Sequence, residues 1–249
     1  MRQNLPVTQR ERTFSVEERL ISTTDLNSKI TYCNDAFVAI SGFTREELVG
    51  QPHNLVRHPD MPPAVFGHMW DTLKQGKPWM GLVKNRSKNG DFYWVSAYVT
   101  PVYENGRMVG YESVRSLPSR EQVARADALY ARLRAGKSPV PRLARWGYDF
   151  MRSWPVVLAT LVLLAGNLLL EGWPSMALLL VTMLGLGSLQ LYRYRQTIRQ
   201  TLEQHPKAFT SDLVALTYTD SRGAQALLDM AMISEEARLQ TALTRLEDA

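Results

Sequence analysis

Five short segments in which apolar and polar residues alternate predict the strands of one sheet. Such a period of two turns one face of each strand toward a core, and Val, Tyr and Trp favour strands. Asn-Gly pairs at 89–90 and 105–106 separate the last three segments and are typical of tight hairpins. We therefore expect those three to form an antiparallel meander. The segments are residues 20–24, 30–33, 78–87, 91–104 and 107–116.

Helix signals fill the stretch between the second and third of these segments. Asn34 or Asp35 can cap a short helix, and Thr44 with Glu47 makes a capping box for another. Residues 62–76 begin with two prolines and end with glycine, as a longer helix does. The order indicates an α+β domain with helices on one face of the sheet and a pocket between them.

Two apolar runs, residues 154–170 and 175–192, predict a transmembrane hairpin. Aromatic residues stand at their ends, and the short connector between them carries no basic residue. Arginines precede the first run and follow the second, which by the positive-inside rule places both termini in the cytoplasm. A buried hairpin in a soluble protein is the alternative.

The net charge of +5 and the isoelectric point near 9.4 follow from these membrane-flanking arginines, so we do not expect nucleic-acid binding. The single cysteine, Cys33, excludes an internal disulfide. Residues 119–150 look helical and basic, and two further helices are expected after the hairpin, the first ending at His205 and the second covering 226–249.

The pattern defines five regions. They are an N-terminal cap (1–18), the α+β domain (19–119), a basic helical linker (120–153), the transmembrane hairpin (154–192) and a cytoplasmic helical tail (193–249).

Two long motifs, GQPHNLVRHPDMP and GKPWMGLVKNRSKNGDFYWV, resemble the PAS domain of bacterial aerotaxis (energy-taxis) transducers. The resemblance covers about residues 10–120, and a membrane hairpin after the domain continues it. It implies a PAS fold, a five-stranded antiparallel sheet with short helices, that binds FAD noncovalently and reports redox or oxygen state to the chemotaxis machinery. It also implies that the tail is HAMP-like.

Seven residues are candidates for contact with the flavin. Trp70 and Trp79 offer large rings, and Asn85 lies on the same strand face as Trp79 because their spacing is even. A loop of basic and acidic residues before a helix can meet phosphate or orient the residues that do. The resemblance points to the same positions. The full set is Arg57, His58, Asp60, Phe66, Trp70, Trp79 and Asn85, with His53 and Asn54 as weaker candidates.

The sequence also bears on interpretations other than noncovalent FAD binding. A haem-based gas sensor remains an alternative because His58 or His68 can supply an axial ligand. A flavin–cysteine photoadduct is not expected, since Cys33 lies on a predicted strand. No enzyme or metal-site motif is found, so we expect a noncatalytic protein. A PAS module that only dimerises, without a ligand, is the second alternative.

The resemblance ends before the output domain. Family transducers continue into a methyl-accepting coiled coil that contacts the histidine kinase, and we expect that domain to be absent from this chain, which stops at Ala249. The expected partners are a second copy or a larger receptor assembly. The chemotaxis kinase and coupling protein are expected to be reached indirectly or through another receptor chain.

Overall fold

The computed structural model describes residues 4–140, 172–205 and 208–247, with a few more between 157 and 166. It divides into two compact units. The first combines Met1–Pro139 with Lys207–Ser221 and Ala226–Ala249, and the second combines Val140–Pro206 with Arg222–Gln225.

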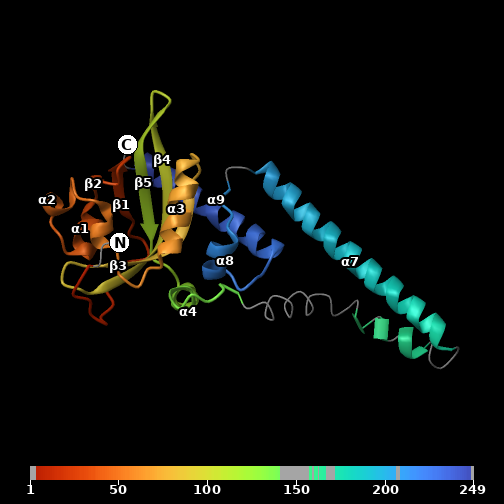
Figure 1. Ribbon diagram of the computed structural model, residues 1–249. Helices are drawn as coiled ribbons and strands as arrows, with labels where there is room; N and C mark the ends of the chain where they lie inside the picture. Colours follow the sequence, from red (N-terminus) through yellow and green to blue (C-terminus); the bar gives the residue numbers. More distant parts are fainter. Residues whose placement is uncertain are drawn as a thin grey trace. The chain divides into compact units, whose positions relative to one another are not determined.

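Five antiparallel strands form the centre of the first unit, as the alternating segments predict (Figure 1). Their order across the sheet is β2-β1-β5-β4-β3, so the N-terminal hairpin joins the meander where β1 pairs with β5. β3 is therefore an edge strand. The strands are β1 (Leu20–Asp25), β2 (Ile30–Cys33), β3 (Trp79–Arg86), β4 (Phe92–Glu104) and β5 (Arg107–Ser116).

The predicted caps and turns between these elements are confirmed. Asn34 accepts a hydrogen bond from the backbone N–H of Phe37, and Thr44 forms its capping box with Glu47. The hairpin between β4 and β5 turns at Asn105-Gly106, where both residues have positive φ. The helical elements between β2 and β3 are α1 (Asp35–Ser41), α2 (Arg45–Leu48), the 3₁₀ helix η1 (His53–Val56) and α3 (Pro63–Lys74).

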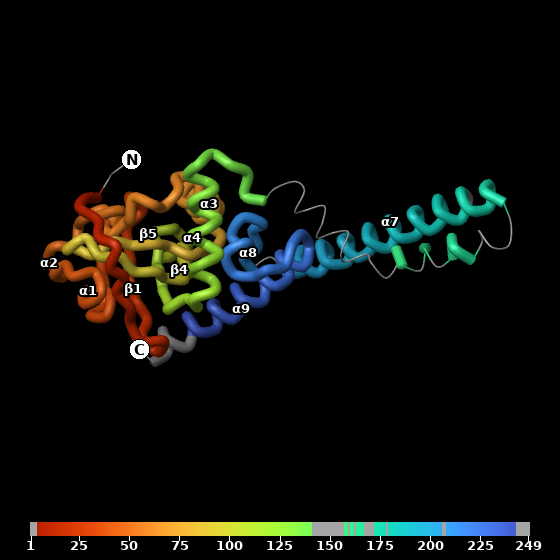
Figure 2. The backbone as a smooth tube through the Cα atoms, turned by 90° about the horizontal axis from the view of Figure 1, so that it is seen from below, coloured from red at the N-terminus to blue at the C-terminus, as the bar shows by residue number. Residues whose placement is uncertain are grey.

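Helices cover both faces of the sheet at its β3 edge. α3 packs on the inner face of β3 and β4, while α4 (Arg120–Arg134) and α8 (Asp212–Tyr218) lie against β3 and one another (Figure 2). On the outer face the Tyr130 ring stacks on Trp94 at 6.1 Å, and the Tyr218 and Ser96 hydroxyls are 2.6 Å apart. All eight residues of β3 are consequently buried, although it is an edge strand.

The helical segments after the sheet differ in part from the prediction. The helix expected over 119–150 is α4, which ends at Arg134 because Gly136 adopts a left-handed φ of +67°. Residues 141–150 lie outside the described part of the chain. The last predicted helix is α9 (Ala224–Glu247). The short α8 was not predicted: its seven residues carry too little periodicity to stand out.

The N-terminal segment forms an extended strap along the sheet domain. Its backbone pairs with the β3–β4 turn and the start of β4, through Thr8 N–H to Gly90 O and Arg12 N–H to Phe92 O. Asn4 donates from its side-chain amide to two carbonyls, that of Asn54 within η1 and that of Arg57, the residue that ends η1.

In the second unit the long helix α7 (Trp173–Gln204) contains the second predicted membrane span and continues to His205, as expected. Its 32 residues extend about 48 Å, more than the roughly 30 Å hydrocarbon core. By length and composition this is one helix able to cross a membrane, and its apolar window is unburied. The first predicted span lies largely outside the described residues.

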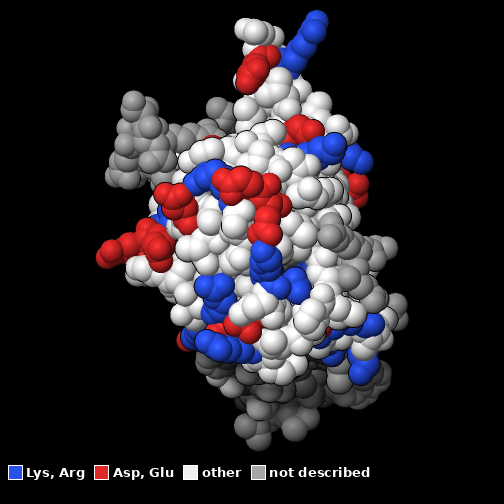
Figure 3. Space-filling model, turned by 90° about the vertical axis from the view of Figure 1, so that its left-hand side faces the viewer, with Lys and Arg blue, Asp and Glu red and all other residues white. Residues whose placement is uncertain are grey.

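Charges of both signs intermix on the face shown in Figure 3.

Two glycines offer a matched test of the sheet. A Cβ at Gly110 would lie 2.0 Å from the Thr24 carbonyl oxygen across the β1–β5 pair, while a Cβ at Gly67 on α3 meets nothing within 4 Å. Gly110→Ala should therefore destabilise the domain by about 1–3 kcal/mol, and Gly67→Ala should stabilise it by about 0.5–1 kcal/mol. Thermal unfolding of the full chain in mild detergent, followed by near-ultraviolet circular dichroism, checks both. Equal melting temperatures would contradict the close β1–β5 approach.

Candidate functional site

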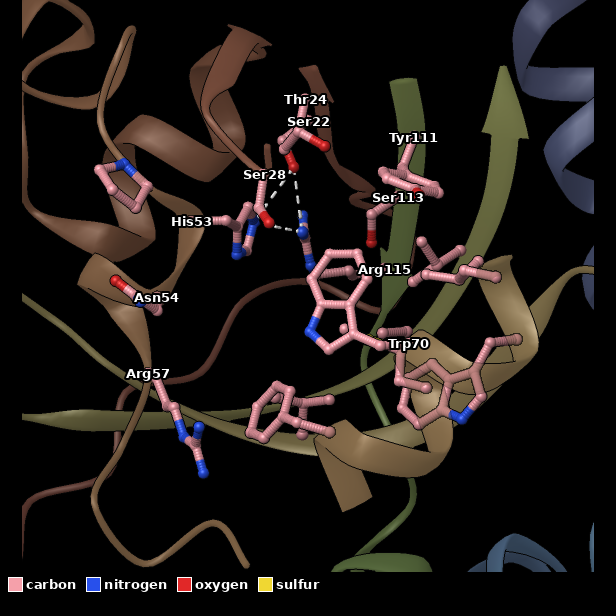
Figure 4. Close-up of a pocket in the computed structure, with 18 of the residues that line it drawn as sticks. Ser22, Thr24, Ser28, His53, Asn54, Arg57, Trp70, Tyr111, Ser113 and Arg115 are labelled. Atoms are coloured by element: carbon pink, nitrogen blue, oxygen red, sulfur yellow. Dashed lines mark hydrogen bonds between the residues drawn. The ribbon is translucent and has the colours of Figure 1, made fainter. Parts of the chain in front are cut away.

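A cavity of about 240 Å³ lies between the inner face of the sheet and the helices α3 and η1 (Figure 4). This is somewhat below the roughly 300 Å³ at which typical ligand pockets begin. It has an apolar, aromatic wall and a polar end, the composition expected of a site for a flat, partly polar ligand. The wall consists of Phe66, Met69, Trp70, Leu73, Trp79, Val83, Ala97, Val99 and Tyr111, and the polar end of Ser22, His53, Ser113 and Arg115. Asn85 also lines the cavity but lies on β3, where its backbone pairs with that of Arg57.

Arg115 on β5 places a buried cation at the polar end. Its side chain points toward His53 on η1 and donates to His53 Nε2 at 2.7 Å and to Ser22 Oγ at 3.0 Å (Figure 4). The residue is 3% exposed, and within the described residues no ion pair includes it. Burial lowers its pKa to about 10, so the guanidinium stays charged at neutral pH. A buried cation without a counter-ion strongly favours a ligand that brings electron density to it.

His53 is held neutral by the same cluster. Burial, with the nearby Arg115 charge, lowers its pKa to about 3. Since Arg115 donates to Nε2, that nitrogen carries the lone pair and Nδ1 carries the proton. His53 therefore acts as a fixed acceptor that orients Arg115.

Two further donors line the cavity without partners. Asn85 Nδ2 and Ser113 Oγ are buried and complete no hydrogen bond in the described part of the chain. The Asn85 amide approaches the Tyr93 hydroxyl, but neither group reaches hydrogen-bond geometry. Because an unmet buried polar group costs about 1–3 kcal/mol, these atoms indicate where a ligand forms hydrogen bonds.

The aromatic wall is built around the fully buried Trp79. Its indole lies over Gly81 two residues along the strand, where an added Cβ would come within 2.3 Å of the ring. The Trp70 ring meets Tyr111 edge-on at 5.5 Å. These contacts leave the rings little freedom, so the wall presents a preformed surface.

Arg57 lies on the opposite side of the cavity from the Arg115 cluster (Figure 4). Its guanidinium stacks over the Phe66 ring at 4.0 Å and donates to the Met61 carbonyl at 3.0 Å. The Asn4 strap holds the Arg57 carbonyl from outside. The loop and its cation are thereby fixed beside the cavity.

Two of the seven predicted site residues lie elsewhere. His58 and Asp60 do not line the cavity; they form a separate cluster with Lys84 on the outer face of β3. Burial alone would raise the pKa of Asp60, but the 2.8 Å hydrogen bond from Lys84 and the positive charges of Lys84 and Arg134 together hold that pKa below its ordinary value. Burial and the Lys84 charge lower the pKa of His58 to about 4. Arg134 of α4 adds a hydrogen bond to the Asp60 backbone carbonyl. The cluster therefore fixes the loop that carries Arg57.

The structure brings together the other five predicted residues, Arg57, Phe66, Trp70, Trp79 and Asn85, and with them the weaker candidates His53 and Asn54. Arg115 and Ser113 were missed. Their signal was present: with Tyr111 they share one face of a strand at even spacing, where an arginine is unusual.

In the described part of the chain, no histidine offers a free nitrogen to the cavity as a haem ligand would. His58 and His68 are not among the lining residues, and His53 uses Nε2 toward Arg115. Cys33 is buried and also outside the lining. Among the described residues no group of His, Cys, Asp and Glu side chains can hold a metal ion.

Comparison with known proteins gives the class of the domain. Residues 30–115 match the family described as the PAS fold. A PAS domain from Colwellia psychrerythraea superposes with 26% identity and a TM-score of 0.35, over 41% of this chain and 87% of that one. The family match places a PAS domain in the first unit, as the sequence predicts.

The particular relatives are signalling proteins. Over 132 residues the chain is 52% identical to the aerotaxis receptor of Escherichia coli, covering 53% of this chain and 26% of that protein. The nitrogen fixation regulatory protein of Klebsiella pneumoniae is 37% identical over 82 residues, 33% of this chain and 17% of its own. The predicted resemblance to aerotaxis receptors is confirmed over the PAS region, and the chain spans about a quarter of that receptor's length.

The neutral His53 generates a pH prediction. Its pKa falls from an ordinary 6.5 to about 3 in the folded chain, so the unfolded chain binds protons more strongly between these values. This contribution to stability is complete above pH 6.5 and is lost as the pH falls toward 3. Gln can accept from Arg115 without titrating. The stability advantage of the wild type over His53→Gln should thus shrink from pH 7 to pH 4.5 in thermal melts, and parallel curves would contradict the assignment.

Proposed function

We propose that this protein is a membrane-anchored, noncatalytic redox and energy sensor for aerotaxis that holds FAD in the PAS cavity. The observation that carries the proposal is the lining of the cavity: a buried cation and two unmet donors around an aromatic wall. The isoalloxazine ring is flat and apolar on its faces and carries acceptors on one edge, so it matches this combination.

The residues present divide the work of binding. Trp79, Trp70 and Phe66 supply faces for a flat ring system, and Ser113 and Arg115 supply donors for its polar edge. Asn85 supplies a further donor on β3, beside Arg57. Arg57 is the cation proposed to meet the pyrophosphate. His58 and Asp60 act on the loop instead of touching the ligand.

FAD, when bound, supplies reversible electron uptake. Reduction places more negative charge on the polar edge of the ring, and the fixed Arg115 charge favours that form. Asn85 can donate through its amide nitrogen or accept through its oxygen, so its side chain is suited to distinguish the two redox forms. The change in hydrogen bonding at Asn85 is proposed to shift the position of the sheet or the preceding loop. That movement would pass to the tail helices and favour one of their two signalling conformations.

The remaining steps are proposed for the whole assembly. α7 and the preceding apolar run would anchor the chain in the bacterial inner membrane, with both termini in the cytoplasm and the tail acting as a HAMP-like relay. A second copy or a larger receptor assembly would pass the signal to the chemotaxis kinase and coupling protein.

The testing experiment is the visible absorption spectrum of the full chain purified in mild detergent, before and after dithionite. An oxidised-flavin band that bleaches, with FAD released by heat, is expected. Asn85→Ala should weaken FAD binding by roughly 5–100-fold, the cost of one lost buried hydrogen bond. Asn89→Ala, in the β3–β4 turn outside the cavity, is the matched control.

A colourless protein that stays colourless with added FAD would favour the ligand-free dimerisation module. A haem spectrum would favour the gas sensor.

A second prediction concerns the midpoint potential. Arg115→Gln removes the buried positive charge but keeps a donor, so the reduced form of the ligand should lose stabilisation and the potential should fall by roughly tens of millivolts. Arg107→Gln, at the exposed start of the same strand, should leave it unchanged. Spectroelectrochemical titration of both variants checks this, and an unchanged Arg115→Gln potential would place the polar edge of the flavin elsewhere.

A further inference from the structure

A chain of hydrogen bonds leads from the cavity wall to the tail. The Trp79 indole Nε1–H donates to His68 Nδ1 at 3.1 Å, and His68 Nε2 lies 3.2 Å from Ser211 Oγ. Trp79 lines the cavity, His68 stands on α3, and Ser211 immediately precedes α8. The three residues therefore join the ligand site, the helix that covers it and a tail helix 143 residues from His68 along the chain.

The chemistry of the three groups fixes the direction of the bonds. An indole N–H can only donate, so His68 Nδ1 must carry its lone pair. In a neutral imidazole Nε2 then carries the proton and donates to Ser211 Oγ. Burial lowers the pKa of His68, which agrees with a neutral ring. A single tautomer of His68 thus forms both hydrogen bonds. Rotating the ring would break both of them.

Ser211 is the N-cap of α8. Its Oγ also receives the backbone N–H of Val214, at 3.4 Å. A helix of seven residues is too short to persist on its own and depends on its cap and its packing. The segment before α8 is tied to α9, because the Phe209 N–H donates to Ser234 Oγ at 2.9 Å. A change at Ser211 would therefore be felt by both tail helices.

We propose that His68 is a positioning residue that transmits the state of the cavity, through the Trp79 indole, to the N-cap of α8. This rests on the proposed function, in which the cavity holds FAD. The indole packs closely over Gly81 and cannot tilt toward the strand. A ligand that presses on the opposite face of the ring therefore shifts the edge that carries Nε1. That edge is bonded to His68, and the displacement arrives at Ser211.

The other end of α8 supplies a matched control. Tyr218 at its C-terminus bonds Ser96 on the outer face of β4, which does not line the cavity. Loss of that bond should loosen α8 equally in both redox states. Loss of His68 should instead remove the difference between the states.

The experiment is hydrogen–deuterium exchange of the full FAD-loaded chain in detergent, oxidised and dithionite-reduced, monitored over residues 209–218. The wild type should show a redox-dependent change in exchange rate of roughly fivefold, the scale of one hydrogen bond. His68→Leu should abolish this difference while flavin absorbance and stoichiometry persist. Tyr218→Phe should raise exchange in both states and keep the difference.

Two partial substitutions sharpen the test. Asn at position 68 can mimic the acceptor Nδ1, and Gln can reach the position of Nε2. His68→Asn and His68→Gln should each lose the redox difference, because each retains only one of the two bonds.

A redox difference that survives in His68→Leu with flavin bound would overturn the inference and leave the proposed function intact. A chain that binds no flavin would overturn the proposed function. The inference would then be decided without ligand by a cycle of Trp79→Phe and His68→Leu: non-additive effects on α8 exchange support it, and additive effects reject it.

Discussion

The buried guanidinium of Arg115 is the constraint on which the cavity depends. A cation enclosed on the inner face of a sheet must be oriented by fixed acceptors, and the chain supplies three of them: the Leu20 carbonyl, Ser22 Oγ and His53 Nε2. This requirement explains why His53 is neutral and why η1 approaches β1 and β5. The acceptors are dipoles and not charges, so the positive field remains available to whatever occupies the cavity.

The outer face of the sheet is constrained as well, because β3 is buried on both of its faces. An edge strand usually presents open backbone groups or charged side chains to solvent. Here α4 and α8 cover its outer face, and Lys84 pairs there with Asp60. The inner face of the sheet therefore lines the cavity, and its outer face packs against α4 and α8.

Local patterns were enough to predict most of the fold. Alternating residues located all five strands, and Thr44, Glu47 and the Asn-Gly turns located helix starts and hairpins, because these signals depend on neighbours in sequence. The site was harder. Trp79 and Asn85 share a strand face and both line the cavity, whereas His58 and Asp60 lie near Arg57 in sequence but turn toward Lys84. The orientation of His58 and Asp60 depends on where β3 lies in the folded domain, which the local sequence does not show. The contact between His68 and Ser211 likewise depends on the folded tail.

The bond between Ser96 and Tyr218 spans 122 residues of chain, and it has a consequence for biosynthesis. At a translation rate of about 5–20 residues per second, roughly 6–25 s separate the appearance of the two residues at the ribosome. During that interval the sheet can already close around its core, yet the surface reserved for α8 has no intramolecular cover. The outer face of β3 and β4 is thus the part of the nascent domain most open to chaperones and to premature pairing with another chain.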